Sequence, residues 1–202
     1  RSSDGEPKVI YFRSGSAASR TTPDIVDDID FDGIKILHIT GIFSALAPNT
    51  YDTVTRLVDT AKQHGVTVLF DPNPRPTLWP SEEAMIDATN KLAAKSDVFM
   101  PGLEEGRLFS GKTGPRDIAE WYLDMGIGKV IIKLGDVGSV LFERTSDGDL
   151  SETVVPSFVV NVVDTVGAGD GFASGVITAL LEGLDNERLL ERANAVGVIQ
   201  VT

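Results

Sequence analysis

Short apolar runs rich in β-branched residues alternate with longer segments of helical period, and this rhythm restricts the fold more than any other feature of the sequence. Four of the runs are apolar on both faces, which is typical of strands covered by helices on both sides. We predict strands at residues 35–40, 66–71, 97–100 and 129–134. The alternation predicts an α/β fold with a mostly parallel sheet.

Helical segments fill the gaps between these runs. Proline favours the first helical position, and glycine favours the end of a helix. Predicted helices run from Pro48 to just before Gly65, over residues 82–95 and over residues 115–125. Each of these links has the length and pattern of a crossover between parallel strands.

The second half of the chain changes rhythm. Two β-rich segments, residues 138–144 and 152–155, flank a polar turn at residues 146–149, which predicts an antiparallel hairpin. A long helix is then expected at residues 168–182, and a last helix is expected to begin near Asn186.

Composition limits the kinds of partner. The 202 residues are 42% apolar and 24% charged, so one domain spanning residues 1–202 is expected. A formal net charge of −12 repels nucleic acid and anionic membranes. No apolar run approaches the ~20 residues of a membrane span, and the lack of cysteine fits a reducing compartment. The sequence therefore predicts a cytoplasmic protein whose partners are small molecules.

Both ends of the chain indicate a piece of a longer protein. Residues 196–202 are still apolar and periodic, and residues 9–13 enter a strand almost at once. Strand edges exposed in such a piece favour association, so a homo-oligomer is a further expectation.

The string DTVGAGD at residues 164–170 carries the strongest chemical signal. It lies between a strand-like segment and a helix, and its small residues let backbone N–H groups and the positive end of the helix dipole approach an anion. Asp170, in the first turn of the helix, could accept a proton from a hydroxyl that attacks a γ-phosphate. A glycine turn followed by an acidic helix cap is the alternative that these residues leave open.

This string resembles the signature of the ribokinase-like (PfkB) carbohydrate kinases, and the resemblance extends through most of the chain. It implies a ribokinase-like three-layer α/β/α core that lacks the N-terminal lid region of the family. It also implies that Asp170 is the catalytic base and that Gly167, Ala168 and Gly169 form an anion hole. The implied activity is phosphoryl transfer from ATP to a sugar, with Mg²⁺ and a monovalent cation such as K⁺.

The same resemblance implies a nucleotide site built from a strand, the turn that follows it and the last helix. Its ATP-binding residues would be Lys133, Leu134, Gly135, Gly138, Ser139, Gly167, Ala168, Gly169 and Asn194. Asn194 corresponds to the adenine side of that site.

Two further segments, YFRSGSAAS at residues 11–19 and FDPNPRPTLW at residues 70–79, resemble the branch of the family that phosphorylates the sugar acid 2-keto-3-deoxygluconate. Arg13 and Arg75 could bind its carboxylate and hydroxyls with forked, charge-assisted hydrogen bonds, and Tyr11 offers a hydroxyl and a ring face. Asp170 would also contact this acceptor. The alternative is that Arg75 only pins a proline-rich loop and that Arg13 is solvated.

The segment MPGLEE at residues 100–105 departs from the family pattern. It resembles a metal-linked Asn-x-x-Glu motif, but Gly102 stands at the asparagine position. Glu105 remains and could hold Mg²⁺ through water, although a solvated helix face is the ordinary role of such a residue. Together with the missing lid region, this departure keeps two alternatives open. One is a kinase for fructose, ribose or a nucleoside, and the other is a ligand-binding domain without catalysis.

Several other residues are expected to be structural. GRLFSGKT at residues 106–113 matches the P-loop pattern, but its context predicts a helix that ends before the lysine and another that restarts at Pro115. His38 is expected to pack within a strand and His64 to lie on the surface at a helix end. The tryptophans, Trp79 and Trp121, are expected to be packing residues.

Overall fold

The computed structural model describes Arg13 and residues 15–202. The predicted role of Tyr11 and most of the predicted strand at residues 9–13 lie outside the described residues. Arg13 itself has no regular secondary structure and is half-buried.

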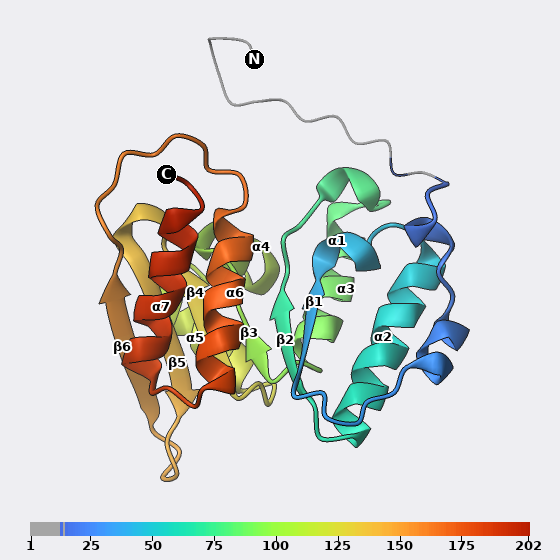
Figure 1. The fold of residues 1–202 in the computed structure, drawn as a ribbon, viewed down its shortest axis with the longest axis horizontal. Helices are drawn as coiled ribbons and strands as arrows, with labels where there is room; N and C mark the ends of the chain where they lie inside the picture. The colour runs from blue at the N-terminus through green and yellow to red at the C-terminus, as the bar shows by residue number, and fades with distance from the viewer. Residues whose placement is uncertain (1–12, 14) are drawn as a thin grey trace.

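A six-stranded sheet runs through the molecule, and its strands are neighbours in chain order (Figure 1). The strands are β1 Ile36–Thr40, β2 Thr67–Asp71, β3 Val98–Phe99, β4 Lys129–Lys133, β5 Gly138–Arg144 and β6 Leu150–Pro156. Strands β1 to β4 pair in parallel, and β4, β5 and β6 pair antiparallel. The mostly parallel sheet and the hairpin are confirmed.

Helices connect the strands. They are α1 Gly41–Ser44, α2 Pro48–Gln63, α3 Glu82–Ala93, α4 Leu103–Ser110, α5 Pro115–Leu123, α6 Ala168–Leu181 and α7 Asn186–Ile199. Four short 3-10 helices lie at Ala18–Arg20, Pro23–Asp28, Pro76–Leu78 and Gly135–Val137. Proline occupies the first turn of α2 and α5, and side-chain oxygens of Ser81 and Asp185 cap α3 and α7.

Successive residues of the inner strands face two different apolar cores, as the alternation of side chains along a strand requires. On one face, Val68, Phe70 and Ile132 pack with α2, α3 and α5. On the other face, Leu69 and Ile131 pack with α6 and α7. Figure 1 shows α6 and α7, in orange and red, in front of the sheet, while α2 covers it on the other side. The three-layer architecture is therefore confirmed.

Strand β3 is shorter than the predicted run at residues 97–100. Met100 still donates its N–H to the carbonyl of Phe70 at 2.9 Å, but the N–H of Gly102, two residues later, donates to the Glu105 Oε2 at 2.7 Å and not to β2. The chain instead follows β4, where the N–H of Lys133 donates to the Pro101 carbonyl at 3.0 Å. The pairing of β3 with β2 therefore ends at Met100.

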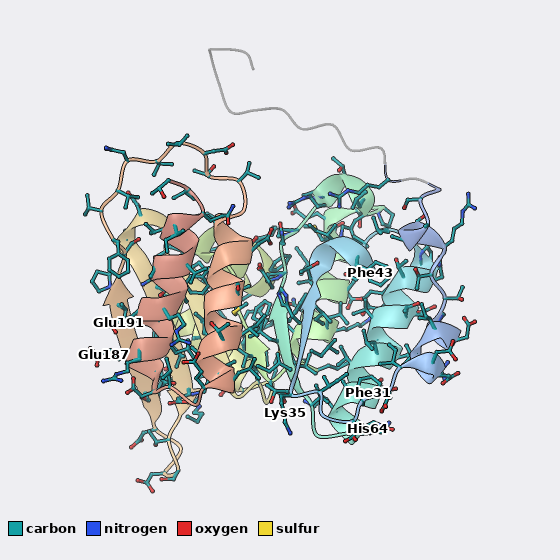
Figure 2. All side chains as sticks on the ribbon, in the orientation of Figure 1. Phe31, Lys35, Phe43, His64, Glu187 and Glu191 are labelled. Carbon is teal, nitrogen blue, oxygen red and sulfur yellow. The ribbon has the colours of Figure 1, made fainter. Side chains whose placement is uncertain are left out.

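The residues expected to be structural have the predicted surroundings. Helix α4 ends at Gly111, which has a φ of 69°, so the lysine of the P-loop pattern lies in the link between two helices and not at the start of one. His64 is exposed at the end of α2 and stacks on Phe31, with ring centroids 5.1 Å apart (Figure 2). Trp79 and Trp121 are partly buried against the first core.

The acidic excess is carried partly by outward-facing helix surfaces. Glu187 and Glu191 project from α7 away from the sheet (Figure 2). Within the part of the chain that the structure describes, no helix has the length and apolarity needed to cross a membrane.

Candidate phosphoryl-transfer site

The carboxyl ends of two parallel strands carry a buried ion pair. Asp71 is the last residue of β2 and Lys133 is the last residue of β4. The Lys133 Nζ donates to the Asp71 Oδ1 at 2.8 Å, and the side chains are only 19% and 3% exposed, respectively. In open α/β sheets this edge is where ligands bind. The pair therefore marks the edge of the sheet on which to look for a site.

The first turn of α6 lies against this ion pair. Gly167 caps the helix with a φ of 86°, in the left-handed region that favours glycine. A Cβ placed on Gly169 would lie 3.9 Å from both the Asp71 Oδ2 and the Lys133 Nζ. The first N–H groups of a helix have no acceptors within the helix, so this turn presents donors beside an ammonium group. The predicted glycine turn and the predicted Lys133 are thus brought together.

Asp170 lies in the same first turn and is exposed. It is close enough to the strand ends to act on His38 of β1. Burial lowers the pKa of His38 below its usual value, and the carboxylates of Asp71 and Asp170 offset only part of this effect. His38 was predicted to be a packing residue, and its buried Nε2 has no hydrogen-bond partner within the described structure. Sequence reasoning missed that this ring faces the charged cluster.

A pocket of about 710 Å³ opens beside the ion pair, within the usual size range of small-molecule sites. Its polar wall includes Glu105, Lys133, Gly135, Gly138 and Gly169. The apolar lining consists of Phe158, Val159, Val160, Val162, Phe172, Val198 and Val201. The pocket therefore joins a charged end near α6 to a hydrophobic end that suits a planar base.

The backbone that forms one wall of this pocket has room only for glycine at position 138. Its φ is 124°, and a Cβ at this position would lie 2.2 Å from the carbonyl oxygen of Val155. Strands β5 and β6 approach each other too closely here for any side chain. The glycine predicted from the family pattern therefore has a steric reason.

Two of the predicted ATP-binding side chains use their polar atoms within the protein. The Ser139 hydroxyl, fully buried, donates to the Asn194 Oδ1 at 2.9 Å. The Asn194 amide nitrogen donates to the carbonyls of Val155 at 3.1 Å and Pro156 at 3.2 Å. Asn194 lines the pocket, whereas Ser139 and Leu134 do not border it. These residues tie α7 to the hairpin behind the pocket wall.

Glu105, the predicted metal ligand, lies at the edge of the pocket. Its Oε2 accepts from the Gly102 N–H at 2.7 Å, which satisfies one backbone donor at the start of α4. Burial raises its pKa, and the charge of Lys133 and the Gly102 N–H offset part of that rise. Among Arg13 and residues 15–202, no three His, Asp or Glu side chains converge on a metal position. Mg²⁺ would therefore depend on phosphate oxygens and water for most of its ligands.

Arg75 is held by its own loop. Its Nη1 donates to the Asn73 Oδ1 at 2.5 Å and to the Pro74 carbonyl at 2.8 Å, and Asn73 has an unusual φ of 35°. The Arg75 charge also opposes the raised pKa of Glu105. Arg75, which was predicted to bind the sugar substrate, thus both orders the proline-rich loop and places a cation near the site.

Gly41 and Asp71 belong to this region, although sequence reasoning did not select them. A Cβ on Gly41 would lie 1.9 Å from the Pro72 carbonyl oxygen, so the start of α1 touches the loop after β2. The available signals were a glycine between a strand and a helix, and a carboxylate that ends an apolar strand.

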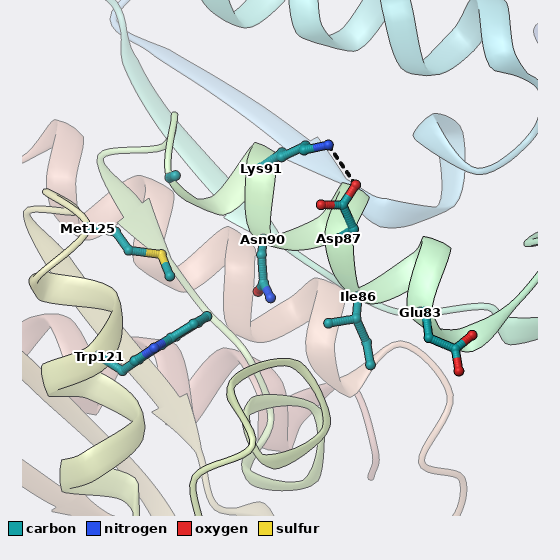
Figure 3. A pocket seen from close by; sticks show the side chains of 8 residues that line it. Glu83, Ile86, Asp87, Asn90, Lys91, Trp121 and Met125 are labelled. Carbon is teal, nitrogen blue, oxygen red and sulfur yellow. Dashed lines mark hydrogen bonds and ion pairs between the residues drawn. The ribbon is translucent and has the colours of Figure 1, made fainter.

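A second hollow of about 570 Å³ lies between α3 and α5, on the opposite face of the sheet (Figure 3). It is shallow and mostly apolar, with Ile86, Trp121 and Met125 around it. Asp87 at its rim pairs with Lys91 at 2.6 Å. The glycine turn and the buried ion pair are not part of this hollow, so the chemistry is concentrated at the other site.

Known proteins resemble the chain along its whole length. It is 42% identical over 198 residues to the 2-dehydro-3-deoxygluconokinase of Bacillus subtilis, covering 98% of this chain and 60% of that protein. It is 30% identical to the 2-dehydro-3-deoxygluconokinase of Thermoproteus tenax, covering 98% of this chain and 58% of that protein. The chain thus spans about 60% of the length of the curated relatives it matches.

Solved structures share the fold. A PfkB protein from Polaromonas sp. JS666 superposes with a TM-score of 0.85 at 40% identity, covering 97% of this chain and 63% of that one. The aminoimidazole riboside kinase of Salmonella enterica, complexed with aminoimidazole riboside and an ATP analogue, gives a TM-score of 0.75 at 26% identity, with 91% and 61% covered. The pfkB family carbohydrate kinase model matches residues 1–202. The chain belongs to the pfkB family of carbohydrate kinases.

Proposed function

We propose that the protein containing this chain transfers the γ-phosphoryl group of ATP to a hydroxyl of 2-keto-3-deoxygluconate, also called 2-dehydro-3-deoxygluconate, to give the 6-phospho product. The proposal rests chiefly on the glycine turn of α6, where a Cβ placed on Gly169 would lie 3.9 Å from the Lys133 Nζ at the edge of a nucleotide-sized pocket. The acceptor is supported by the relatives that bear the name 2-dehydro-3-deoxygluconokinase.

Asp170 is the general base of this proposal. It accepts the proton of the acceptor hydroxyl as the new oxygen–phosphorus bond forms and the bond to the β-phosphate oxygen breaks, so that ADP leaves. Its exposed position in the first turn of α6 lets a substrate hydroxyl reach it. The reaction balances without any further reagent.

The glycine turn and Lys133 stabilise the charge on the transferred group. Phosphoryl transfer needs little covalent help from a protein, so positioned donors supply most of the catalysis. In this proposal, the Ala168 N–H, which donates to the Thr165 carbonyl at 3.3 Å, exchanges that partner for a phosphate oxygen. The backbone of Gly167 and Gly169 provides further N–H groups, and the Lys133 ammonium provides a cation beside them. Both are held by regular structure, which fixes them before the substrate arrives.

The residues present fit the cofactors. Gly169 leaves room for phosphate oxygens beside Lys133, and the apolar end of the pocket, with Asn194 in its lining, would take the base. Glu105 would hold Mg²⁺ through water, and the ion would neutralise the β- and γ-phosphates when bound. A K⁺ ion beside the glycine turn stays a prediction from the family resemblance, tested by exchanging K⁺ for Li⁺ in the assay.

Arg75 and Arg13 are proposed to select a sugar acid. A neutral hexose has no carboxylate to match them, whereas a guanidinium fork binds a carboxylate with two parallel hydrogen bonds. The loop fixes Arg75 through its Nη1, so less side-chain freedom is lost when a substrate binds.

The test is an ATP-dependent phosphorylation assay on the full-length protein with 2-keto-3-deoxygluconate, fructose, ribose and gluconate as acceptors. Selective turnover of the keto-deoxy acid, abolished in Asp170→Asn, is the expected result. Turnover of a neutral sugar instead would contradict the acceptor assignment. No turnover of any acceptor would favour a ligand-binding domain without catalysis.

A further inference from the structure

The buried carboxylate of Asp71 has no part in the reaction as described so far. We propose that Asp71 is a positioning residue for phosphoryl transfer, which holds the Lys133 ammonium against the first turn of α6. The inference rests on the proposed kinase function and deepens it. Asp71 acts through Lys133 and does not itself touch the substrate.

The placement of the two side chains supports this role. The Asp71 side chain is 3% exposed and does not line the pocket, whereas Lys133 is 19% exposed and does. The hydrogen bond of 2.8 Å from Nζ to Oδ1 therefore links a buried anchor to a cation at the pocket surface. A Cβ placed on Gly169 would lie 3.9 Å from both the second carboxylate oxygen, Oδ2, and the Lys133 Nζ, so the ion pair lies against the turn at which we propose that the γ-phosphate binds.

The neighbouring basic side chains do not replace Lys133 as the partner of the Asp71 carboxylate. His38 also interacts electrostatically with Asp71, but burial lowers the pKa of its ring and so disfavours a second cation beside the carboxylate. Arg75, the next cation, is bound to Asn73 and Pro74 of its own loop. A lysine has three rotatable donors on a flexible stem and needs such an anchor to keep one position.

Stability alone explains this ion pair poorly. A buried ion pair often stabilises a fold no more than apolar residues of the same size would, because both charges lose their hydration. The same strand offers a comparison at its other end, where Lys129 bonds Glu143 and Asn186. That cluster ties β4 to β5 and α7 and does not border the pocket, so it serves as a matched structural control.

A double-mutant cycle on the full-length protein tests the proposal. Asp71→Asn is expected to lower kcat for 2-keto-3-deoxygluconate about 10- to 100-fold while the KM for the sugar acid changes less than about threefold. In a Lys133→Gln background, the same substitution is expected to change kcat less than about threefold, because the group that Asp71 positions is gone. Equal effects of Asp71→Asn in the two backgrounds would overturn the proposal.

Nucleotide binding gives a second readout that needs no turnover. In Asp71→Asn, affinity for AMP-PNP, a nonhydrolysable ATP analogue, is expected to fall about 3- to 10-fold and affinity for ADP to change less than about twofold. Equal losses for the two nucleotides would contradict a position facing the γ-phosphate. A selective loss in a protein that phosphorylates no acceptor would keep the role of Asp71 and overturn the kinase proposal.

Thermal unfolding separates positioning from simple destabilisation. Glu143→Gln is expected to lower the melting temperature and to leave kcat within about twofold of the wild type, since it breaks a paired carboxylate away from the pocket. If Glu143→Gln lowers kcat as much as Asp71→Asn does, the effect at Asp71 is structural and the proposal fails.

Discussion

The two ends of strand β4 use the same chemistry for different purposes. Lys129 at the amino end and Lys133 at the carboxyl end each pair with a carboxylate, Glu143 and Asp71. At the amino end the partners satisfy one another and join β4, β5 and α7. At the carboxyl end the lysine remains in contact with a pocket. The sheet edge, more than the residue type, separates the structural ion pair from the one for which we propose a function.

Asp170→Asn, at the carboxyl edge of the sheet, is expected to have the largest effect on turnover. The amide cannot accept the proton of the acceptor hydroxyl, so kcat is expected to fall about 10²- to 10⁴-fold. The backbone of the glycine turn is unchanged, and the Kd for ATP measured by calorimetry is expected to change less than about threefold. Turnover close to that of the wild type would exclude Asp170 as the base.

Arg75→Gln tests how the carboxyl end of the sheet recognises its sugar substrate. Loss of the guanidinium is expected to raise the KM for 2-keto-3-deoxygluconate about 10- to 100-fold, because a charge-assisted contact to the carboxylate is lost. Weak activity on a neutral sugar such as fructose is expected to stay within about threefold of the wild-type value, which makes that sugar the internal control. An equal loss for both sugars would mean that Arg75 only orders its loop.

Glu143→Gln tests the amino end by stability and pH. Burial favours the neutral form of Glu143, but hydrogen bonds from Lys129 and Asn186 outweigh it, so its pKa lies below the usual 4.5. A carboxylate with a lowered pKa in the folded state stabilises the protein above pH 4.5, and this contribution is lost as the pH falls through the folded-state value.

Denaturant unfolding at pH 7 and at pH 4 measures this contribution. The variant is expected to lose about 1–2 kcal/mol of unfolding free energy at pH 7 and less at pH 4. Asp52→Asn, at an exposed position on α2, provides a charge-matched control. A loss that does not shrink at the lower pH would contradict the assignment of the stabilisation to the Glu143 charge.

Much of the fold could be predicted because burial on both faces is visible in the sequence. The runs at residues 66–71 and 129–134 contain few polar residues, and the structure places them as β2 and β4 in the middle of the sheet. The ends of the elements were harder to predict. Residues 97–100 have the composition of a strand, but pairing with β2 ends at Met100, and the chain then follows β4.

The candidate site was predictable only in part. Asp170 and the glycine turn could be selected from their place between a strand-like segment and a helix, and Lys133 from the resemblance to the family. The partners of these residues could not, since Asp71 and Lys133 are 62 positions apart, and Ser139 and Asn194 are 55 apart. Such pairings depend on how side chains meet across strands, which no local pattern records.

The spacing of the strands sets the length of side chain that this ion pair requires. Strands β2 and β4 are separated by β3, so their backbones lie about 9–10 Å apart, or two strand spacings. An aspartate at the end of β2 and the long side chain of a lysine at the end of β4 meet across this distance. The single strand between them thereby sets the reach required of a cation at the candidate site.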